Sequence, residues 1–398
     1  MPDRRLASFD RLMRSFVAAH DVPGAALAVS RGGRLVYARG FGFADPKTKE
    51  PVQPDSLFRI ASISKPITAA AVLRLADQGR LRLDERVFPL LDVEPHLEEG
   101  KSPDPRLGEI TVLHLLRHTG GWDRSKSFDP MVMESARIAR ALGSEPPASA
   151  GQIIRYMAGR PLDFAPGERY AYSNFGYCLL GRVIEKVTGR PYEEAVRLEV
   201  FAPLGIRKPR LGKTLPEGRA PGEVTYDTRD GRTAPAVVGE KIGEPVPMPY
   251  GAWYLEAMDA HGGWVASAPD LVRFAAAFDD PKLSPLMSEE AVGVMFARPE
   301  GSAGYEADGT PKETYYGCGW QVVAAGEKGE QNHFHTGSLD GTSTILVRRA
   351  DGLNWAVLFN RRNGRGRKAL ASLIDPLVHE AADEVKEWPE EDLFGRYL

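Results

Sequence analysis

The sequence lacks most of the features that mark specialised classes of protein. It has two cysteines, Cys178 and Cys318, in 398 residues. Two are too few for a disulfide framework or a zinc site, so we expect buried free thiols. A net charge of −3 favours neither nucleic acid nor an anionic membrane surface as a partner. No apolar run is long enough to span a membrane.

The N-terminus likewise lacks the continuous apolar segment of a signal peptide. Its apolar residues recur at helical spacing, which predicts an amphipathic helix; they are Leu6, Phe9, Leu12, Met13, Phe16 and Val17. We therefore expect a cytoplasmic protein. With 42% hydrophobic and 26% charged residues, the chain can bury a sizeable core as one large or two closely packed domains.

Strand-like segments lie at both ends of the chain, and helices lie in the middle. Apolar runs around residues 31–33 predict a β-hairpin, and further strands are predicted at residues 317–325, 332–337, 342–350 and 353–360. Helices are expected at residues 60–77, 110–118, 175–188, 192–202, 268–279, 283–297 and about 365–382. Residues 119–150 and 206–252 are irregular or rich in proline and glycine, and loops of that length are usually lids or substrate walls.

This order of elements predicts an α/β fold of the α+β kind. Both termini would build one antiparallel sheet flanked by helices, with a mostly helical domain inserted between them. We expect a single catalytic unit over residues 1–398. Its sheet subdomain would cover about 1–75 and 255–398, and its helical subdomain about 76–254.

Ser62 and Lys65 lie three residues apart at the start of a predicted helix, in the segment RIASISKPITAA. Positions i and i+3 share a helix face, so the amine can reach the hydroxyl. A serine hydroxyl becomes a nucleophile when a neighbouring base takes its proton, and desolvation can lower the pKa of a lysine enough for that role. The alternative is a capping serine beside a solvated lysine, since an S-x-x-K pattern arises by chance roughly once in such a chain.

A second feature, Tyr172-Ser173-Asn174, lies directly before the helix predicted from residue 175. A turn there would direct a phenol and a carboxamide into a shared cleft. A tyrosine near a lysine can relay a proton, and an asparagine can orient the lysine and bind a substrate amide. The alternative is that Ser173 or Asn174 only caps the helix, with Tyr172 packed beneath it.

A third feature, His335-Thr336-Gly337-Ser338, lies on a predicted C-terminal strand. Gly337 would leave room for a substrate backbone to approach. An edge strand could pair with that substrate and offer the Ser338 N–H to an oxyanion. The alternative is a strand that ends in a glycine-rich turn, with His335 as a surface histidine.

These three patterns, in this order, resemble the serine β-lactamase and penicillin-binding-protein superfamily, whose motifs include S-x-x-K and K-T-G. Tyr-x-Asn in the middle position is similar to the branch with class C β-lactamases, D-alanyl-D-alanine carboxypeptidases, D-aminopeptidases and family VIII carboxylesterases. Further segments between roughly residues 20 and 360 share the resemblance: LFRIASISKPITAA, ITVLHLLRHTGGW, PGERYAYSNFGYCLLGRVIEKVTGRPYEE, GGWVASAPDLVRF, YGCGW and HTGSLDGTS.

The resemblance implies a β-lactamase/transpeptidase-like fold and a serine hydrolase. Ser62 would attack a carbonyl and form an acyl-enzyme, while Lys65 and Tyr172 would share the proton transfers. Asn174 would position Lys65 and the substrate, and the backbone N–H groups of Ser62 and Ser338 would form the oxyanion hole. The resemblance implies no metal or organic cofactor, and a small-molecule ester, amide or β-lactam as the substrate.

One residue departs from the family pattern, because His335 stands where penicillin-recognising enzymes have lysine. An imidazole with its usual pKa of about 6.5 is mostly neutral at pH 7. It could donate one hydrogen bond to a substrate but would supply no permanent cation for a carboxylate. We therefore expect an esterase-like activity. The alternatives are a β-lactamase, a D-alanyl-D-alanine carboxypeptidase or a D-aminopeptidase, and beyond them an acyltransferase or a non-catalytic binding module.

The remaining histidines do not predict a metal site. His114 and His118 are four residues apart, a spacing that can bind a metal, but no third ligand is evident in the sequence. His379-Glu380 lacks the second histidine of a zinc-protease motif. We assign a metal to neither pair.

Overall fold

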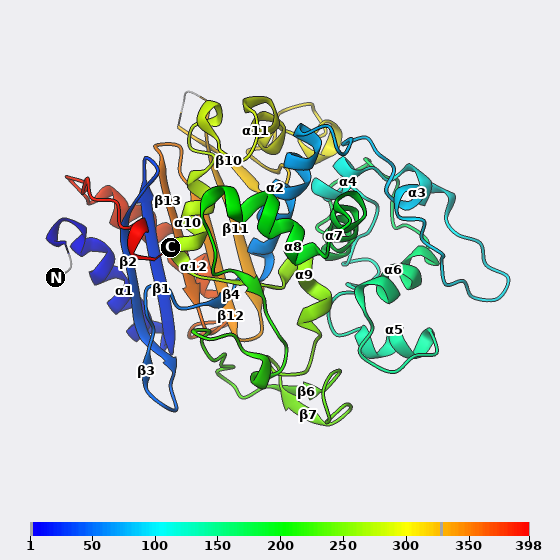
Figure 1. Cartoon of the computed structure of the whole chain (residues 1–398), viewed down its shortest axis with the longest axis horizontal. Coiled ribbons are helices and arrows are strands. Elements are labelled where there is room, and N and C mark those ends of the chain that lie inside the picture. The colour runs from blue at the N-terminus through cyan, green and yellow to red at the C-terminus, as the bar shows by residue number, and fades with distance from the viewer. Residues whose placement is uncertain (1–2, 327–328, 398) are drawn as a thin grey trace.

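The computed structural model describes residues 3–326 and 329–397. In this part of the chain, eight strands form one antiparallel sheet in the order β3-β2-β1-β13-β12-β11-β10-β9 (Figure 1). The N-terminal strands therefore pair directly with the last strand, as predicted. The bounds in this sheet are β1 Gly24–Arg31, β2 Arg34–Asp45, β3 Glu50–Pro51, β9 Thr314–Tyr316, β10 Gln321–Ala325, β11 Glu330–Leu339, β12 Thr342–Arg348 and β13 Leu353–Phe359.

Smaller strand pairs lie outside this sheet. Strand β8 pairs with β4 on one side and β5 on the other, and β6 pairs with β7. Their bounds are β4 Phe58–Arg59, β5 Arg210–Leu211, β6 Thr233–Pro235, β7 Pro245–Pro247 and β8 Trp264–Ala266. The pairing of β4 with β8 matters for function, because β4 leads directly into the segment that contains Ser62.

Helices cover both faces of the main sheet. Helices α1 and α12 pack together on one face, while α10 packs across β1 and β13 on the other. Figure 1 shows α3, α5 and α6 on the side of the molecule opposite α1. The helices are α1 Ala7–His20, α2 Ser64–Asp77, α3 Val87–Leu91, α4 Val112–Leu116, α5 Ser135–Ala141, α6 Ala150–Ala158, α7 Asn174–Thr188, α8 Tyr192–Val196, α9 Asp259–Gly262, α10 Ala268–Ala276, α11 Glu289–Phe296 and α12 Leu370–Asp383.

Alternation along the central strands explains why both sheet faces are apolar. In β1, Ala25 and Leu27 join the cluster formed with α1 and α12, whereas Ala26 and Ala28 join the cluster formed with α2 and α10. A central strand thus contributes side chains to both cores. Its sequence is therefore an almost continuous apolar run and does not alternate between apolar and polar residues. The sheet is consequently a buried, well-supported layer on which α2 and its catalytic candidates rest.

Most expected elements are confirmed. The N-terminal helix buries Phe9, Met13 and Phe16 as its spacing predicted. Gly32 and Gly33 form the two-residue turn between β1 and β2, with φ angles of 53° and 77°, the left-handed values that such hairpin turns require. Both cysteines are free and buried, as expected.

Other expectations about local structure were wrong. Residues 119–150 are not irregular throughout, because Ser135–Ala141 form α5; a helix this short shows too few turns for its period to stand out. Helix α6 was not expected at all. The last helix begins at Leu370 rather than near residue 365, since Gly364 and Gly366 precede it and glycine disfavours helix.

The α+β fold with one antiparallel sheet built from both ends of the chain is confirmed. The division into a sheet subdomain and a helical subdomain at about residues 75 and 254 stays a prediction. Within the described residues, no helix combines the length and the apolar character needed to cross a membrane. A cytoplasmic location also stays a prediction.

Candidate active site

Ser62 lies at the junction between a short strand and a buried helix. Strand β4 ends at Arg59, a 3₁₀ turn covers Ala61–Ile63, and α2 begins at Ser64. Ala61 has a φ of 48°, in the left-handed region that costs a non-glycine residue roughly 1–2 kcal/mol. This strained turn leaves Ser62 partly exposed, while the residues on both sides of it are buried.

Lys65 is buried one helical turn away from Ser62. Its Nζ lies 3.3 Å from Ser62 Oγ, 2.8 Å from Asn174 Oδ1 and 2.9 Å from the His261 carbonyl oxygen. The amide and carbonyl oxygens can only accept, so each takes one N–H of the amine. A neutral amine then keeps its lone pair for the third neighbour, the Ser62 hydroxyl, which can donate.

The surroundings of Lys65 favour that neutral amine. Burial lowers the pKa of Lys65 well below its usual value of 10.5; Asp129 acts in the opposite direction, and Arg124 lowers the pKa further. Lys65 Nζ also lies 4.8 Å from the centre of the Tyr172 ring and 5.7 Å from that of Tyr177. These rings would stabilise an ammonium once it formed, so the site suits a group that gains a proton during a reaction.

Tyr172 lines the same cleft as Ser62, but it is not itself a base in the resting site. Burial raises the pKa of Tyr172 above its usual value of 10, and the Ser62 hydroxyl acts against that rise without cancelling it. The phenol is therefore protonated near neutral pH. A protonated phenol beside the nucleophile can pass a proton on to another group, which is a narrower role than equal sharing of the base function with Lys65.

Two adjacent residues at the start of α7, the cap Ser173 and the first helical residue Asn174, perform the two functions that the sequence left open. The Ser173 side chain caps the helix by accepting the Gly176 N–H at 3.1 Å. Asn174 is thereby free to place its amide against Lys65, while its Nδ2 donates to Asp129 Oδ2 at 2.6 Å. The capping alternative is thus right for Ser173 and wrong for Asn174.

His118 supports this segment from within the protein. Its Nδ1 accepts the Ser173 N–H at 3.1 Å, and its ring centre lies 4.4 Å from that of Tyr172. His114 instead uses its Nδ1 to accept the Thr111 N–H in the cap of α4. The two histidines therefore have separate structural contacts, which accounts for their spacing without a metal.

His335 has no hydrogen bond left to offer a substrate, which corrects our expectation. Its Nδ1 lies 2.8 Å from the Thr336 carbonyl oxygen, which can only accept, so these contacts assign the ring proton to Nδ1. Its Nε2 lies 2.9 Å from the Tyr316 hydroxyl and accepts from it. Burial, reinforced by the charge of Lys65, lowers the pKa of His335 to about 3. With 2% of its surface exposed, it is also not the surface histidine of the alternative reading.

Gly337 allows the nucleophile segment to pack closely against β11, and its expected role in substrate approach stays a prediction. A Cβ at this position would lie 2.1 Å from the Ile60 carbonyl oxygen and 2.2 Å from Thr344 Oγ1, far inside van der Waals contact. Strand β11 thus runs directly beside the backbone that leads into Ser62. Any larger residue would push the two segments apart.

The predicted residues meet at one cleft of about 600 Å³. Lys65 and Gly337 do not line this cleft, but Lys65 contacts Ser62 and Gly337 packs against the backbone of Ile60, two residues before Ser62. Part of the cleft wall is apolar and is formed by Met248, Trp253 and Met258. The predicted site residues that line the cleft directly are Ser62, Tyr172, Asn174, His335, Thr336 and Ser338.

Sequence reasoning missed four charged residues that line the same cleft. Arg124 lies 3.7 Å from Asp129, and Arg362 lies 3.8 Å from Asp340. Arg362 also donates from Nε to Ser338 Oγ at 2.9 Å. Arg124, Asp129 and Arg362 lie outside the segments that carry the family resemblance, and Asp340 lies inside HTGSLDGTS at a position to which no role was given.

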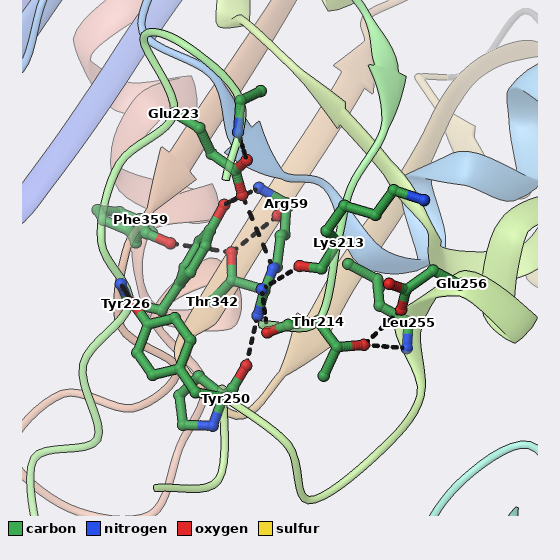
Figure 2. Close-up of polar contacts among 12 residues, drawn as sticks. Arg59, Lys213, Thr214, Glu223, Tyr226, Tyr250, Leu255, Glu256, Thr342 and Phe359 are labelled. Carbon is green, nitrogen blue, oxygen red and sulfur yellow. Dashed lines mark hydrogen bonds and ion pairs between the residues drawn. The ribbon is translucent and has the colours of Figure 1, made fainter. Parts of the chain in front are cut away.

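A buried arginine fixes the long loop over residues 206–252 to the nucleophile segment (Figure 2). Arg59, two per cent exposed, donates to the carbonyl oxygens of Pro249, Lys213 and Thr214 at 2.7, 2.7 and 3.1 Å. Its guanidinium also stacks 4.3 Å from the Tyr226 ring centre. The loop that was predicted to be a substrate wall is thereby attached three residues before Ser62.

A comparison with known protein families agrees with this site. The profile of the family described as Beta-lactamase matches residues 9–378. The chain belongs to the Beta-lactamase family. The superfamily resemblance drawn from the three motifs is thereby confirmed.

Relatives within this family carry different names. Esterase EstB of Burkholderia gladioli is 34% identical over 253 residues, which are 62% of this chain and 59% of the esterase. Penicillin-binding protein 4* of Bacillus subtilis (strain 168) is 27% identical over 355 residues, 88% of this chain and 70% of that protein. The match thus spans less than two thirds of EstB.

A solved structure shares the fold. D-amino acid amidase from Ochrobactrum anthropi SV3, complexed with L-phenylalanine amide, superposes with a TM-score of 0.71 at 23% identity. The superposition covers 96% of this chain and 99% of the amidase. At this identity, the likeness shows the fold alone.

Proposed function

We propose that this member of the Beta-lactamase family is a serine hydrolase that cleaves esters or amides through an acyl-enzyme on Ser62, with neutral esters as its preferred substrates. The observation that carries the proposal is the set of partners around Lys65. Two obligate acceptors hold the buried amine, and its third neighbour is the Ser62 hydroxyl at 3.3 Å. This is the arrangement that a serine needs to become a nucleophile.

The proposed reaction begins when Ser62 Oγ attacks the substrate carbonyl carbon and its proton passes to Lys65 Nζ. The backbone N–H groups of Ser62 and Ser338 stabilise the oxyanion of the tetrahedral intermediate. When the ester bond breaks, the leaving alkoxide receives a proton through Tyr172. Water then attacks the acyl-enzyme, with the same groups taking and returning its proton, and releases the acid.

Two features support neutral esters. His335 is uncharged and has both ring nitrogens occupied, so it cannot act as the cation that a substrate carboxylate would need. The apolar wall of Met248, Trp253 and Met258 suits an acyl chain without charge. EstB of Burkholderia gladioli, a relative in sequence, is named an esterase.

A second candidate is a substrate with a carboxylate, such as a β-lactam or a D-alanyl peptide. The observation in its favour is Arg362, whose guanidinium reaches Ser338 in the cleft. Asp340 lies close enough to Arg362 to offset part of its charge, and Asp129 offsets part of the charge of Arg124. The cleft thus has cations but little net positive charge, which ranks this candidate second.

Turnover of three substrate classes would test both candidates. We would measure kcat/KM for p-nitrophenyl butyrate, nitrocefin and a D-amino-acid amide, with wild type and Ser62→Ala. The butyrate ester should be the best substrate, and Ser62→Ala should lose activity on all three. A wide preference for nitrocefin would establish the second candidate. Activity that survives Ser62→Ala would contradict the proposed mechanism for every substrate.

A further inference from the structure

Asp129 is linked to Lys65 through one intermediate residue, Asn174. Its Oδ2 accepts from Asn174 Nδ2 at 2.6 Å, and Asn174 Oδ1 in turn accepts from Lys65 Nζ at 2.8 Å. Its Oδ1 accepts the Met131 N–H at 3.1 Å, which fixes the carboxylate in a turn. The side chain is 15% exposed, so water competes little for these bonds.

The orientation of the Asn174 amide decides what Lys65 can do. With Oδ1 toward Lys65, the amide takes an N–H and leaves the amine lone pair for the Ser62 proton. If the amide were reversed, its NH₂ would face the amine and use that same lone pair. A carboxylate is an acceptor without a donor, so Asp129 can pair with the NH₂ side of Asn174 and not with its oxygen.

We propose that Asp129 is a positioning residue for the Ser62–Lys65 pair, because its carboxylate fixes the Asn174 amide in the orientation that keeps Lys65 available as a proton acceptor. This inference rests on the proposed function, in which Lys65 takes the Ser62 proton. It adds a residue from the segment 119–150, which no motif connects with the catalytic residues.

Asp129 also belongs to a pair of opposite charges that act on Lys65. Asp129 raises the pKa of Lys65, and Arg124, 3.7 Å from Asp129, lowers it. Removal of the Asp129 charge should therefore lower the pKa of Lys65, and removal of the Arg124 charge should raise it. The other titratable groups that face Lys65 are Tyr172, Tyr177, His118, His261 and His335, and these remain unchanged in both variants.

The first arm of the experiment compares Asp129→Ala with Asp129→Asn. Alanine leaves the Asn174 NH₂ without its acceptor, which should lower kcat for an ester about ten- to hundred-fold. Asparagine keeps one acceptor oxygen and should retain more activity than alanine. The matched control is Asp123→Ala in the same segment. Like Asp129, the Asp123 carboxylate accepts a backbone N–H in a turn, from Ser125, and pairs with an arginine, Arg169. The control should leave kcat within about two-fold.

The second arm measures kcat/KM against pH and follows its acid limb. This limb is the fall in kcat/KM at low pH, where Lys65 is protonated and cannot accept the Ser62 proton. Without the Asp129 anion the ammonium is less stable, so Asp129→Asn should move the limb to lower pH. Without the Arg124 cation the ammonium is more stable, so Arg124→Gln should move the limb to higher pH. Opposite shifts are not expected from local unfolding, which melting temperatures of all variants would report.

The proposal is overturned if Asp129→Ala keeps wild-type kcat, if alanine and asparagine have equal effects, or if the two acid limbs move in the same direction. Ser62→Ala, assayed alongside, keeps this result separate from the proposed function. If Ser62→Ala is inactive while the Asp129 variants behave as wild type, the positioning role alone fails. If Ser62→Ala remains active, the proposed function fails first.

Discussion

Two buried bases lie at the cleft, Lys65 on α2 in contact with Ser62 and His335 on β11 in the cleft wall, and burial lowers the pKa of both. Their hydrogen bonds differ. Lys65 is held by two acceptors and keeps its third contact for the Ser62 hydroxyl. His335 donates to the Thr336 carbonyl and accepts from Tyr316, so neither nitrogen is free.

The difference shows that a shifted pKa alone does not make a proton acceptor. Burial keeps both groups uncharged near neutral pH, but a base also needs a lone pair directed at a group that can donate. Lys65 has that partner in Ser62. The lone pair of His335 is already used by Tyr316, so His335 contributes shape and a neutral surface to the cleft. The experiments below test this contrast.

The largest expected difference is between the losses of kcat when Lys65 and His335 are replaced separately. Lys65→Ala should lower kcat by on the order of 10²-fold or more, because general-base catalysis typically contributes that much. His335→Gln should stay within about ten-fold, since a glutamine amide can accept from Tyr316 and donate to a carbonyl. Steady-state kinetics with p-nitrophenyl butyrate would measure both. Equal losses would end the distinction between the two bases.

Tyr172→Phe should rank next. The phenol is the proposed route for the proton to the leaving group, so its loss should lower kcat by about 10²-fold. The effect should be smaller for a leaving group of low pKa, such as p-nitrophenol, than for an alkyl alcohol, which needs the proton more. Comparison of aryl and alkyl esters would measure this. An unchanged kcat on both would remove Tyr172 from the mechanism.

His335→Lys should alter specificity rather than the basic chemistry. A charge-assisted hydrogen bond to a carboxylate is worth roughly 1.5–3 kcal/mol, or about one to two decades in kcat/KM. The ratio of kcat/KM for nitrocefin to that for p-nitrophenyl butyrate should rise accordingly. His335→Gln is the uncharged control and should leave the ratio near that of wild type. A ratio that lysine does not change would show that position 335 does not contact the carboxylate.

The pH dependence should show the smallest effect of His335. Its pKa of about 3 means that it stays neutral between about pH 5 and 8, where an ordinary histidine would titrate. Activity on nitrocefin should therefore not rise as the pH falls through this range. It should only decline as Lys65 gains a proton. A rise near pH 6.5 that His335→Gln abolishes would indicate a normal histidine pKa.

The sequence was sufficient for the local parts of this account. Ser62 and Lys65 are three residues apart, so the spacing showed that a contact was possible, and the resemblance to a family motif selected it over a capping serine beside a solvated lysine. The sheet from both termini followed from the apolar runs at the two ends of the chain. Tyr172 and Asn174 could be placed before a helix, and their resemblance to a family motif supplied the rest.

The sequence was insufficient where a residue's role depends on a distant partner. The Nε2 atom of His335 accepts a hydrogen bond from Tyr316, which lies on another strand, and no local sequence pattern reveals that bond. Gly337 faces the Ile60 carbonyl across the fold. Asp129 reaches Asn174 from a segment that we expected to be irregular. Such contacts are set by the packing of elements far apart in the chain, and they carry no periodic signal.

The central claim is that Lys65, and not His335, activates Ser62. A fluorophosphonate probe tests it most directly, because the probe reacts covalently with an activated serine and needs no substrate specificity. Mass spectrometry of the digested protein should find the adduct on Ser62 in wild type and His335→Gln at similar rates. Lys65→Ala should label at least about ten-fold more slowly, and Ser62→Ala should not label. Rapid labelling of Lys65→Ala, or of another serine in Ser62→Ala, would contradict the account.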